Sequence, residues 1–301
     1  MTARLALWSM ALLAWCTAGS ALASELPDYV RYREDARTAR LEVAIRRFTM
    51  PSGQKVDLVG VVHIADHAYY QQLNERFETY DSVLYELVGD PARLTRVAPL
   101  PETAPSGGVS FIQQSAGKHL GLAFQLDAID YTRKNLVHAD TSAEEFARLQ
   151  YERGENMLTL FGRAMKAQLV RDLHPSTRSS FDSFALLRIL MSPDSALAFK
   201  KELARSLDQM EASTALMEGQ DGSVILGARN AVAIAKLKEV LANRRQRHVA
   251  VFFGGAHMPG IERALVTDLN AVISGEEWLA AWTMKPREDK NPAPGTATPA
   301  S

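Results

Sequence analysis

Apolar residues in the first third of this chain fall into short runs separated by a stretch with helical spacing. Residues 41–50 and 56–62 form apolar runs typical of strands, and Pro and Gly at 51–53 predict a turn between them. Residues 68–80 carry apolar side chains at helical spacing, and 82–88 forms a third strand-like run. Strand, helix and strand in this order predict a βαβ unit with a parallel pair of strands.

The same rhythm returns near the C-terminal end. Residues 248–253 form a second buried run, followed by a predicted helix at 259–269 and a closing strand at 277–282. Most of the sequence between the two units has a helical pattern. There we expect a short strand at 135–140 and helices at 110–124, 142–171, 181–191, 194–211 and 223–243.

The predicted fold class is therefore α/β, with two βαβ-like units of mostly parallel strands at the N- and C-terminal ends of the domain. A helical insert at about 142–220 separates the two units. We expect a single domain over 24–284 and, from its Pro-, Ala- and Thr-rich composition, a disordered tail over 285–301. Residues 25–40 are expected to be a leading helix or a loose segment.

One short motif occurs twice, each time at the end of an apolar strand. Gly60-Val61-Val62-His63 ends the first buried run, and Gly254-Gly255-Ala256-His257 ends the second. Imidazole binds metals and moves protons near neutral pH, and parallel-sheet folds place ligands at the carboxyl ends of strands. The repeat therefore predicts that His63 and His257 meet in one pocket. The alternative is that each His only hydrogen-bonds a strand end.

Glu86 lies within the third apolar run, where a carboxylate is costly to bury unless it is paired or bound to a cation. We expect its strand to lie beside the His63 strand. Two His and one Glu form a known catalytic metal set that leaves a position open for water or substrate. His63, Glu86 and His257 are thus candidate ligands of a divalent metal, whose identity these residues do not select. A solvent-facing Glu at a strand end is the alternative.

Arg229 and Asn230 open a predicted helix, where an Arg opposes the helix dipole unless it has another partner. Arg229 could clamp a carboxylate or polarise a substrate carbonyl, or it could form a surface salt bridge. Other polar residues are given structural roles. Asp66 and Asp140 are expected to cap the helices that follow them, His138 is at most a supporting partner, and His119, His174 and His248 are expected to be exposed without partners.

Composition narrows the class of protein. Arg4, the apolar segment 5–16 and Ala21-Leu22-Ala23 fit a signal peptide over 1–23, so we expect a periplasmic or secreted protein. An uncleaved anchor is the alternative, although the segment is short for a spanning helix, and no integral membrane span is expected after cleavage. The only cysteine lies in this segment, which excludes disulfides and thiolate ligands from the mature chain. A net charge of −1 gives no indication of a nucleic-acid partner.

Several enzyme classes lack their motifs in this sequence. Gly-x-Ser-x-Gly, a phosphate loop, a dinucleotide fingerprint and His-Glu-x-x-His are all absent. The two Gly-x-x-His motifs, Tyr70, Tyr85-Glu86-Leu87 and Arg229-Asn230 instead resemble, in order and spacing, the TraB/TIKI/GumN family. The resemblance covers about 41–282. It implies a fold shared with erythromycin esterases and haem-binding ChaN proteins, with His63, Glu86 and His257 as metal or catalytic residues and Arg229 and Asn230 in support.

The family also implies a range of activities. TIKI relatives are metal-dependent proteases that favour manganese or cobalt, TraB-type relatives are linked to inhibiting peptide pheromones, and GumN to an exopolysaccharide gene cluster. We therefore predict an exported metal-dependent hydrolase, first of all a peptidase, that uses manganese, cobalt or zinc and acts on a peptide or small-molecule substrate. Two alternatives stay open: a non-catalytic protein that binds haem or another ligand, and a metal-free esterase.

Overall fold

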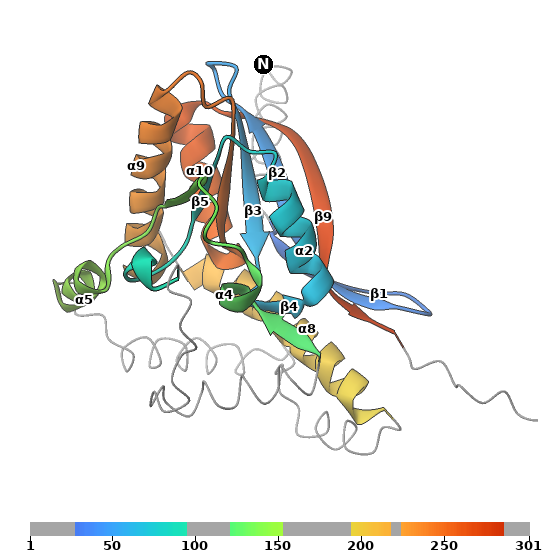
Figure 1. Ribbon diagram of the computed structural model, residues 1–301. Coiled ribbons are helices and arrows are strands. Elements are labelled where there is room, and N and C mark those ends of the chain that lie inside the picture. The colour runs from blue at the N-terminus through green and yellow to red at the C-terminus, as the bar shows by residue number, and fades with distance from the viewer. Residues whose placement is uncertain (1–27, 95–120, 153–193, 218–223, 286–301) are drawn as a thin grey trace, which may run out of the picture.

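The computed structural model describes residues 28–94, 121–152, 194–217 and 224–285, which form a mixed α/β fold on a seven-stranded sheet (Figure 1). Its parallel strands are, in spatial order, β3 (Lys55–Val61), β8 (His248–Gly254), β5 (Ser82–Tyr85) and β7 (Leu136–His138). The α/β class predicted from the sequence is confirmed.

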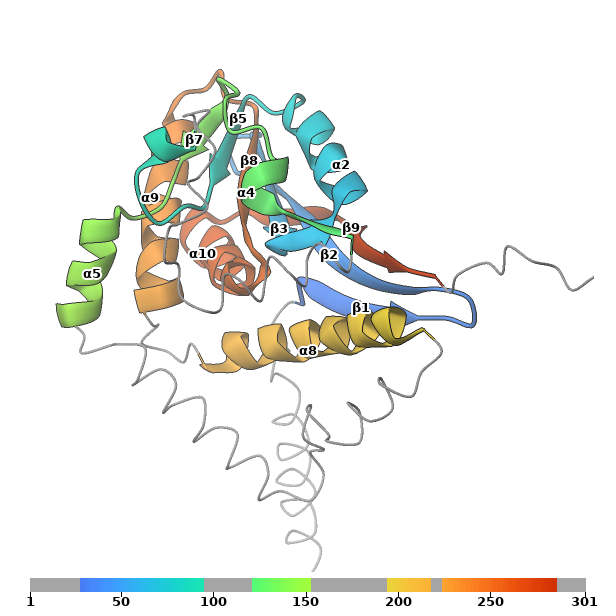
Figure 2. The same cartoon turned by 60° about the horizontal axis from the view of Figure 1, so that its bottom comes forward.

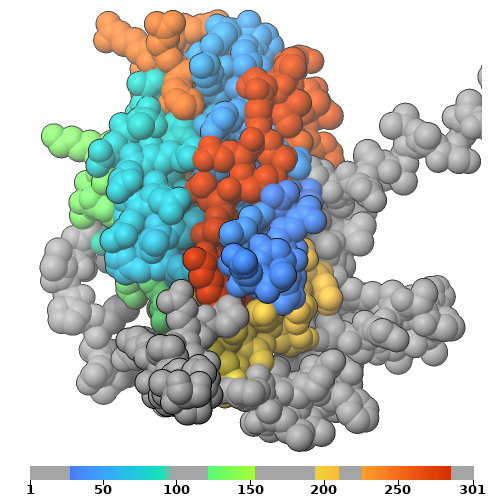
Figure 3. All heavy atoms as spheres, turned by 90° about the vertical axis from the view of Figure 1, so that its right-hand side faces the viewer, coloured from blue at the N-terminus to red at the C-terminus, as the bar shows by residue number. Residues whose placement is uncertain are grey.

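Three antiparallel strands extend this sheet beyond β3. The long strand β2 (Ala39–Thr49) pairs with β3 and also with β1 (Val30–Glu34) and β9 (Val272–Met284). Figure 3 shows β9 in red between α2 in cyan and β1 in blue. The closing strand is therefore longer than the predicted 277–282, because it follows β2 along its whole length.

Helices cover both faces of the sheet. Side chains of β8 alternate between the faces: Phe252 packs with α2 (His67–Phe77), and Phe253 packs with α9 (Arg229–Ala242) and α10 (Met258–Leu269). A further helix, α8 (Ser195–Met217), runs across the end of the sheet where the parallel strands finish (Figures 1 and 2). The four helices agree with the periodicity of the predicted stretches at 68–80, 194–211, 223–243 and 259–269.

Short elements fill the carboxyl end of the sheet. A two-stranded ribbon of β4 (Ile64–Asp66) and β6 (Leu122–Phe124) leads into α4 (Gln125–Ala128). Beyond β5 and β7 come the single turn η1 (Pro91–Arg93) and α5 (Ala143–Glu152). Before α9 lies the π-helical turn η2 (Val224–Ala228), and between β8 and α10 lies η3 (Gly255–His257). Of the candidate residues predicted from the sequence, His257 lies in η3.

Two sequence predictions are wrong. Part of 25–40, expected to be a helix or loose, forms β1 and the start of β2, because Val30 and Ala39 are buried against the sheet. The end of the predicted helix 110–124 is strand β6, which pairs with β4. Residues 110–120, 153–171 and 181–191 lie outside the described residues, as do 1–23 and nearly all of 285–301. None of the described helices has the length and apolar character needed to span a membrane.

Candidate active site

The carboxyl ends of β3, β8 and β5 lie level with one another. Val61 is opposite Gly254, and Tyr85 is opposite Phe252. His63 therefore follows the end of β3, Glu86 follows the end of β5, and His257 lies in η3 just after β8. The expectation that the Glu86 strand adjoins the His63 strand is wrong, because β8 lies between them.

Gly254 allows side chains from either side of β8 to approach each other. A methyl group at its Cβ position would lie 3.2 Å from Oε2 of Glu86 and 3.4 Å from Nε2 of His63. The backbone N–H of Gly254 also donates a hydrogen bond of 2.6 Å to Oε2 of Glu86. The structure thus brings His63 and Glu86 to one point above a residue that has no side chain.

His257 is buried and has a defined orientation. The side-chain amide of Asn230 donates to the carbonyl oxygen of His257 at 3.3 Å, so its Oδ1 faces Nδ1 of the ring at 2.7 Å. Since this oxygen can only accept, Nδ1 carries the proton. The other ring atom, Nε2, lies 3.4 Å from Oε1 of Glu86. With Nδ1 carrying a proton, Nε2 faces Glu86 as a lone pair in the neutral ring and as an N–H donor in the protonated ring.

His63 is held in a parallel way by Gln125, the first residue of α4. The backbone N–H of Gln125 donates to the carbonyl oxygen of His63 at 2.9 Å, and its Oε1 lies 2.8 Å from Nδ1 of the ring. The amide nitrogen of Gln125 donates to the hydroxyl of Tyr131 at 2.9 Å, which leaves Oε1 to accept from Nδ1. As in His257, Nε2 is the ring atom left for chemistry.

Arg229 joins the carboxylates of Glu86 and Asp140. Its Nη2 lies 2.6 Å from Oε1 of Glu86 and 2.6 Å from Oδ2 of Asp140, and its Nε donates to Oδ1 of Asp140 at 2.9 Å. The Arg229 and Asp140 side chains are 8% and 0% exposed, so this is a buried, forked ion pair. The partner expected for an Arg at a helix start is thus present, and the surface salt bridge is excluded.

The environment of Glu86 keeps it ionised. Burial alone would raise its pKa, but the hydrogen bond with His257 and the charges of His257, Arg229 and His63 act more strongly. The pKa of Glu86 is consequently held well below its ordinary value of 4.5. Two carboxylates and one guanidinium leave this cluster with a net charge of −1 when both imidazoles are neutral.

Gln125 and Asp140 are site residues that the sequence reasoning missed. Asp140 was expected to cap α5, but Ser142 does so by accepting the N–H of Glu145 at 3.1 Å. Its place at the end of the predicted strand 135–140 was a usable signal. Gln125 gave no such signal, because only the folded ribbon of β4 and β6 brings it to His63.

Other candidates lie away from the site or have different partners. Asp66 does not cap α2, and instead its carboxylate pairs with Lys200 at 2.7 Å. His248 has partners after all, since its Nε2 lies 3.2 Å from Asp57 and its ring packs on Tyr80. His138 bonds the carbonyl oxygen of Leu87 at 2.7 Å, and its ring packs on Tyr85. His119 and His174 lie outside the described residues.

Among the described residues, no group of three or more His, Cys, Asp or Glu side chains is placed so that it could hold a metal ion. The donor chemistry still suits a divalent ion, because two imidazole Nε2 atoms and a carboxylate face a region of net negative charge. No protein-family model, curated protein or solved structure matches this chain.

Proposed function

We propose that this chain is an exported metal-dependent hydrolase that cleaves peptide bonds. The observation that carries the proposal is the matched orientation of its two histidines. Each Nδ1 donates to a side-chain amide oxygen, from Gln125 for His63 and from Asn230 for His257. Each Nε2 is the ring atom left for a ligand, beside Glu86 in His257 and beside Gly254 in His63. Histidines that bind metals are held in this way by an acceptor at the other ring nitrogen.

His63, His257 and Glu86 would hold the ion. Two ligands about 2.1 Å from a tetrahedral ion would lie roughly 3.4 Å apart, and Nε2 of His257 lies 3.4 Å from Oε1 of Glu86. Nitrogen and carboxylate ligands without thiolates suit manganese, cobalt or zinc. A bound ion would supply Lewis acidity toward the scissile carbonyl and lower the pKa of water.

The supporting residues position these groups. Asn230 fixes the ring of His257 through its carbonyl oxygen and Nδ1 together. Arg229 keeps Glu86 ionised and points its carboxylate toward His257, while Asp140 holds the guanidinium in place. The peptide substrate and the exported location rest on the resemblance to the TraB/TIKI/GumN family and on the N-terminal sequence, respectively.

Metal binding tests the proposal independently of activity. We expect stoichiometric binding of manganese, cobalt or zinc by calorimetry and elemental analysis, and loss of binding in His63→Ala and His257→Ala. Peptide hydrolysis should be lost in the same variants. His67→Ala is the matched control, because His67 is exposed at the start of α2 and should bind metal as the wild type does. Absence of divalent metal binding in the wild type would refute the proposal.

A metal-free ester hydrolase is the second candidate, and the bond of 2.6 Å between Arg229 and Glu86 favours it. An Arg bound this closely takes up one of the carboxylate lone pairs that a metal would need. In that mechanism Nε2 of His257, which lies 3.4 Å from Oε1 of Glu86, would exchange a proton with the substrate. Ester turnover that persists after exhaustive chelation would favour this candidate, whereas peptide turnover restored only by added metal would exclude it.

A further inference from the structure

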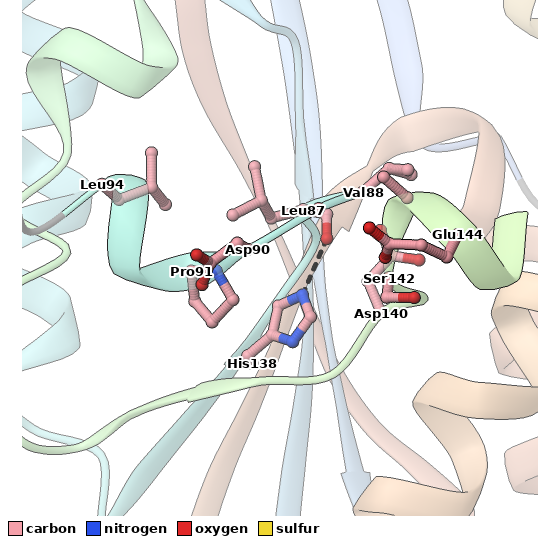
Figure 4. Close-up of a pocket in the computed structure, with 11 residues that line it drawn as sticks. Leu87, Val88, Asp90, Pro91, Leu94, His138, Asp140, Ser142 and Glu144 are labelled. Carbon is pink, nitrogen blue, oxygen red and sulfur yellow. Dashed lines mark hydrogen bonds between the residues drawn. The ribbon is translucent and has the colours of Figure 1, made fainter.

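A cavity of about 550 Å³ lies beside the candidate active site, at the carboxyl ends of β5 and β7 (Figure 4). This volume is within the range of small-ligand sites. The lining starts at Leu87, directly after Glu86, and includes Asp140, which Arg229 links to Glu86. We call this space the side cavity. Its position places it next to whatever group is held at Glu86.

Two chain segments form opposite walls of the side cavity. One wall is the loop after β5 with η1, and the other runs from β7 into α5 (Figure 4). Hydrogen bonds join the walls: His138 Nε2 lies 2.7 Å from the carbonyl oxygen of Leu87, and Gly89 N–H donates to the carbonyl oxygen of Thr141 at 3.2 Å. The space is therefore held open by bonded walls.

The walls combine apolar surface with hydrogen-bond acceptors. Leu87, Val88, Pro91 and Leu94 supply the apolar part. Both walls supply acceptors, namely the carboxylates of Asp90 and Glu144. His138 adds a third: its Nε2 donates to the carbonyl oxygen of Leu87, so in the neutral ring Nδ1 is an acceptor. None of the described lining residues is Lys or Arg. Asp90, Asp140 and Glu144 together outweigh the single positive charge of Arg229.

We propose that the side cavity binds the basic side chain of a peptide substrate, a primary ammonium or guanidinium on an aliphatic stem, next to the bond that is cleaved. The stem would cover Leu87, Pro91 and Leu94, and the cation would lie between Asp90 and Glu144. As a substrate preference, this rests on the proposed peptidase function. An acidic side chain finds no Lys or Arg among the described lining residues, and it would meet the carboxylates of Asp90 and Glu144.

Small probes test the cavity without requiring catalysis. Hexylammonium, hexanol and hexanoate share one stem length, and their binding to the full chain is measured by NMR titration. We expect hexylammonium to bind about fivefold or more tightly than hexanol, and hexanoate not to bind. The double variant Asp90→Asn/Glu144→Gln should lose this preference. Asn at position 90 can still accept the N–H of Ala92, so η1 is preserved.

Glu145→Gln is the matched control, since Glu145 lies on the same turn of α5 but does not line the cavity. Equal binding of hexylammonium and hexanol, or an unchanged preference in the double variant, would overturn the inference. Two peptides that are identical except for Lys or norleucine at one position separate the proposed peptidase function from the proposed cation site. Hexylammonium binding without any peptide cleavage would refute the peptidase and keep the cation site, whereas cleavage without Lys preference or hexylammonium binding would refute the cation site alone.

Discussion

At the scale of single residues, the site depends on the direction of two imidazole rings. Asn230 and Gln125 belong to unrelated segments, yet each bonds both the carbonyl oxygen and Nδ1 of one histidine. Fixing the tautomer in this way leaves Nε2 without a proton in the neutral ring, as either a metal ligand or a base requires. The two side-chain amides therefore set the orientation and the tautomer of the histidines, although the amides themselves take no part in the reaction.

Gln125→Ala should weaken the function of His63 while leaving the fold intact. Losing the acceptor frees the ring to rotate and to change tautomer, so we expect metal affinity and kcat/KM to fall by about 10–100-fold. The nitrogen NMR spectrum of His63 should show the loss of the Nδ1–H form, which a purely structural role would not cause. Gln125→Glu keeps an acceptor and should restore that form. Gln71→Ala, on the exposed side of α2, is the control, and an effect of equal size there would contradict the prediction.

Gly254→Ala should inactivate the protein with little loss of stability. Its φ of −50° and ψ of 142° are open to alanine, and the N–H that bonds Glu86 is kept. The added methyl group would lie between Glu86 and His63, so we expect hydrolysis to fall about 100-fold or more. The free energy of unfolding, from urea titration, should change by about 1 kcal/mol.

Gly275→Ala is the control for that substitution, because its methyl group would meet atoms of Arg47 at no less than 3.7 Å. Comparable activity in Gly254→Ala and Gly275→Ala would show that the space above Gly254 is not used. A large loss of stability in Gly254→Ala would instead assign this glycine a packing role.

At the scale of elements, the sequence predicted the strands better than their order. The apolar runs at 56–62 and 248–253 correspond to β3 and β8, and the helices after them correspond to α2 and α10. The strands are predictable because they are buried on both faces and so form continuous apolar runs, and the helices because their buried side chains recur at helical spacing. The insertion of β8 between β3 and β5 was not predictable, because strand order depends on the path of the whole chain.

In the candidate site, too, local sequence pattern identified some residues and not others. His63, Glu86 and His257 could be found because each lies just after a run of apolar strand residues, where polar side chains are unusual. Gln125 could not be found, since β6 and α4 are too short to leave a periodic pattern. The forked bond between Arg229 and Asp140 joins residues 89 positions apart, a separation at which local pattern carries no information.

At the scale of the whole molecule, α8 joins the sheet edge to the candidate site. It packs on β1 and β2, and it also packs on η3, which carries His257. Charged contacts fasten it: Lys201 and Arg205 bond Glu34 of β1 at 2.8 and 2.6 Å, and Lys200 bonds Asp66 at 2.7 Å. A change in the attachment of α8 is therefore expected to reach the site through η3.

Acid should loosen this attachment. The hydrogen bond from Lys201, followed by that from Tyr32, lowers the pKa of Glu34 from 4.5 to about 2. A pKa lower in the folded than in the unfolded chain means that Glu34 stabilises the fold fully above pH 4.5 and progressively less down to about pH 2. Because Glu34 is partly exposed, we expect Glu34→Gln to cost at most about 1 kcal/mol at pH 7.

Urea unfolding at several pH values measures this contribution as the difference between wild type and Glu34→Gln, which should shrink steadily as the pH falls from 4.5 toward 2.5. Hydrogen exchange should show the corresponding loss of protection in α8 of the wild type, since the protonated carboxyl no longer attracts Lys201 and Arg205.

Lys238→Gln removes a charge from the exposed side of α9, where no contact with Glu34 exists, so its difference from wild type should not follow this profile. A difference between wild type and Glu34→Gln that stays constant down to pH 2.5 would mean that the carboxylate of Glu34 does not hold α8 in place. The stability of α8 would then have to come from its apolar contacts, including the fully buried Ala204.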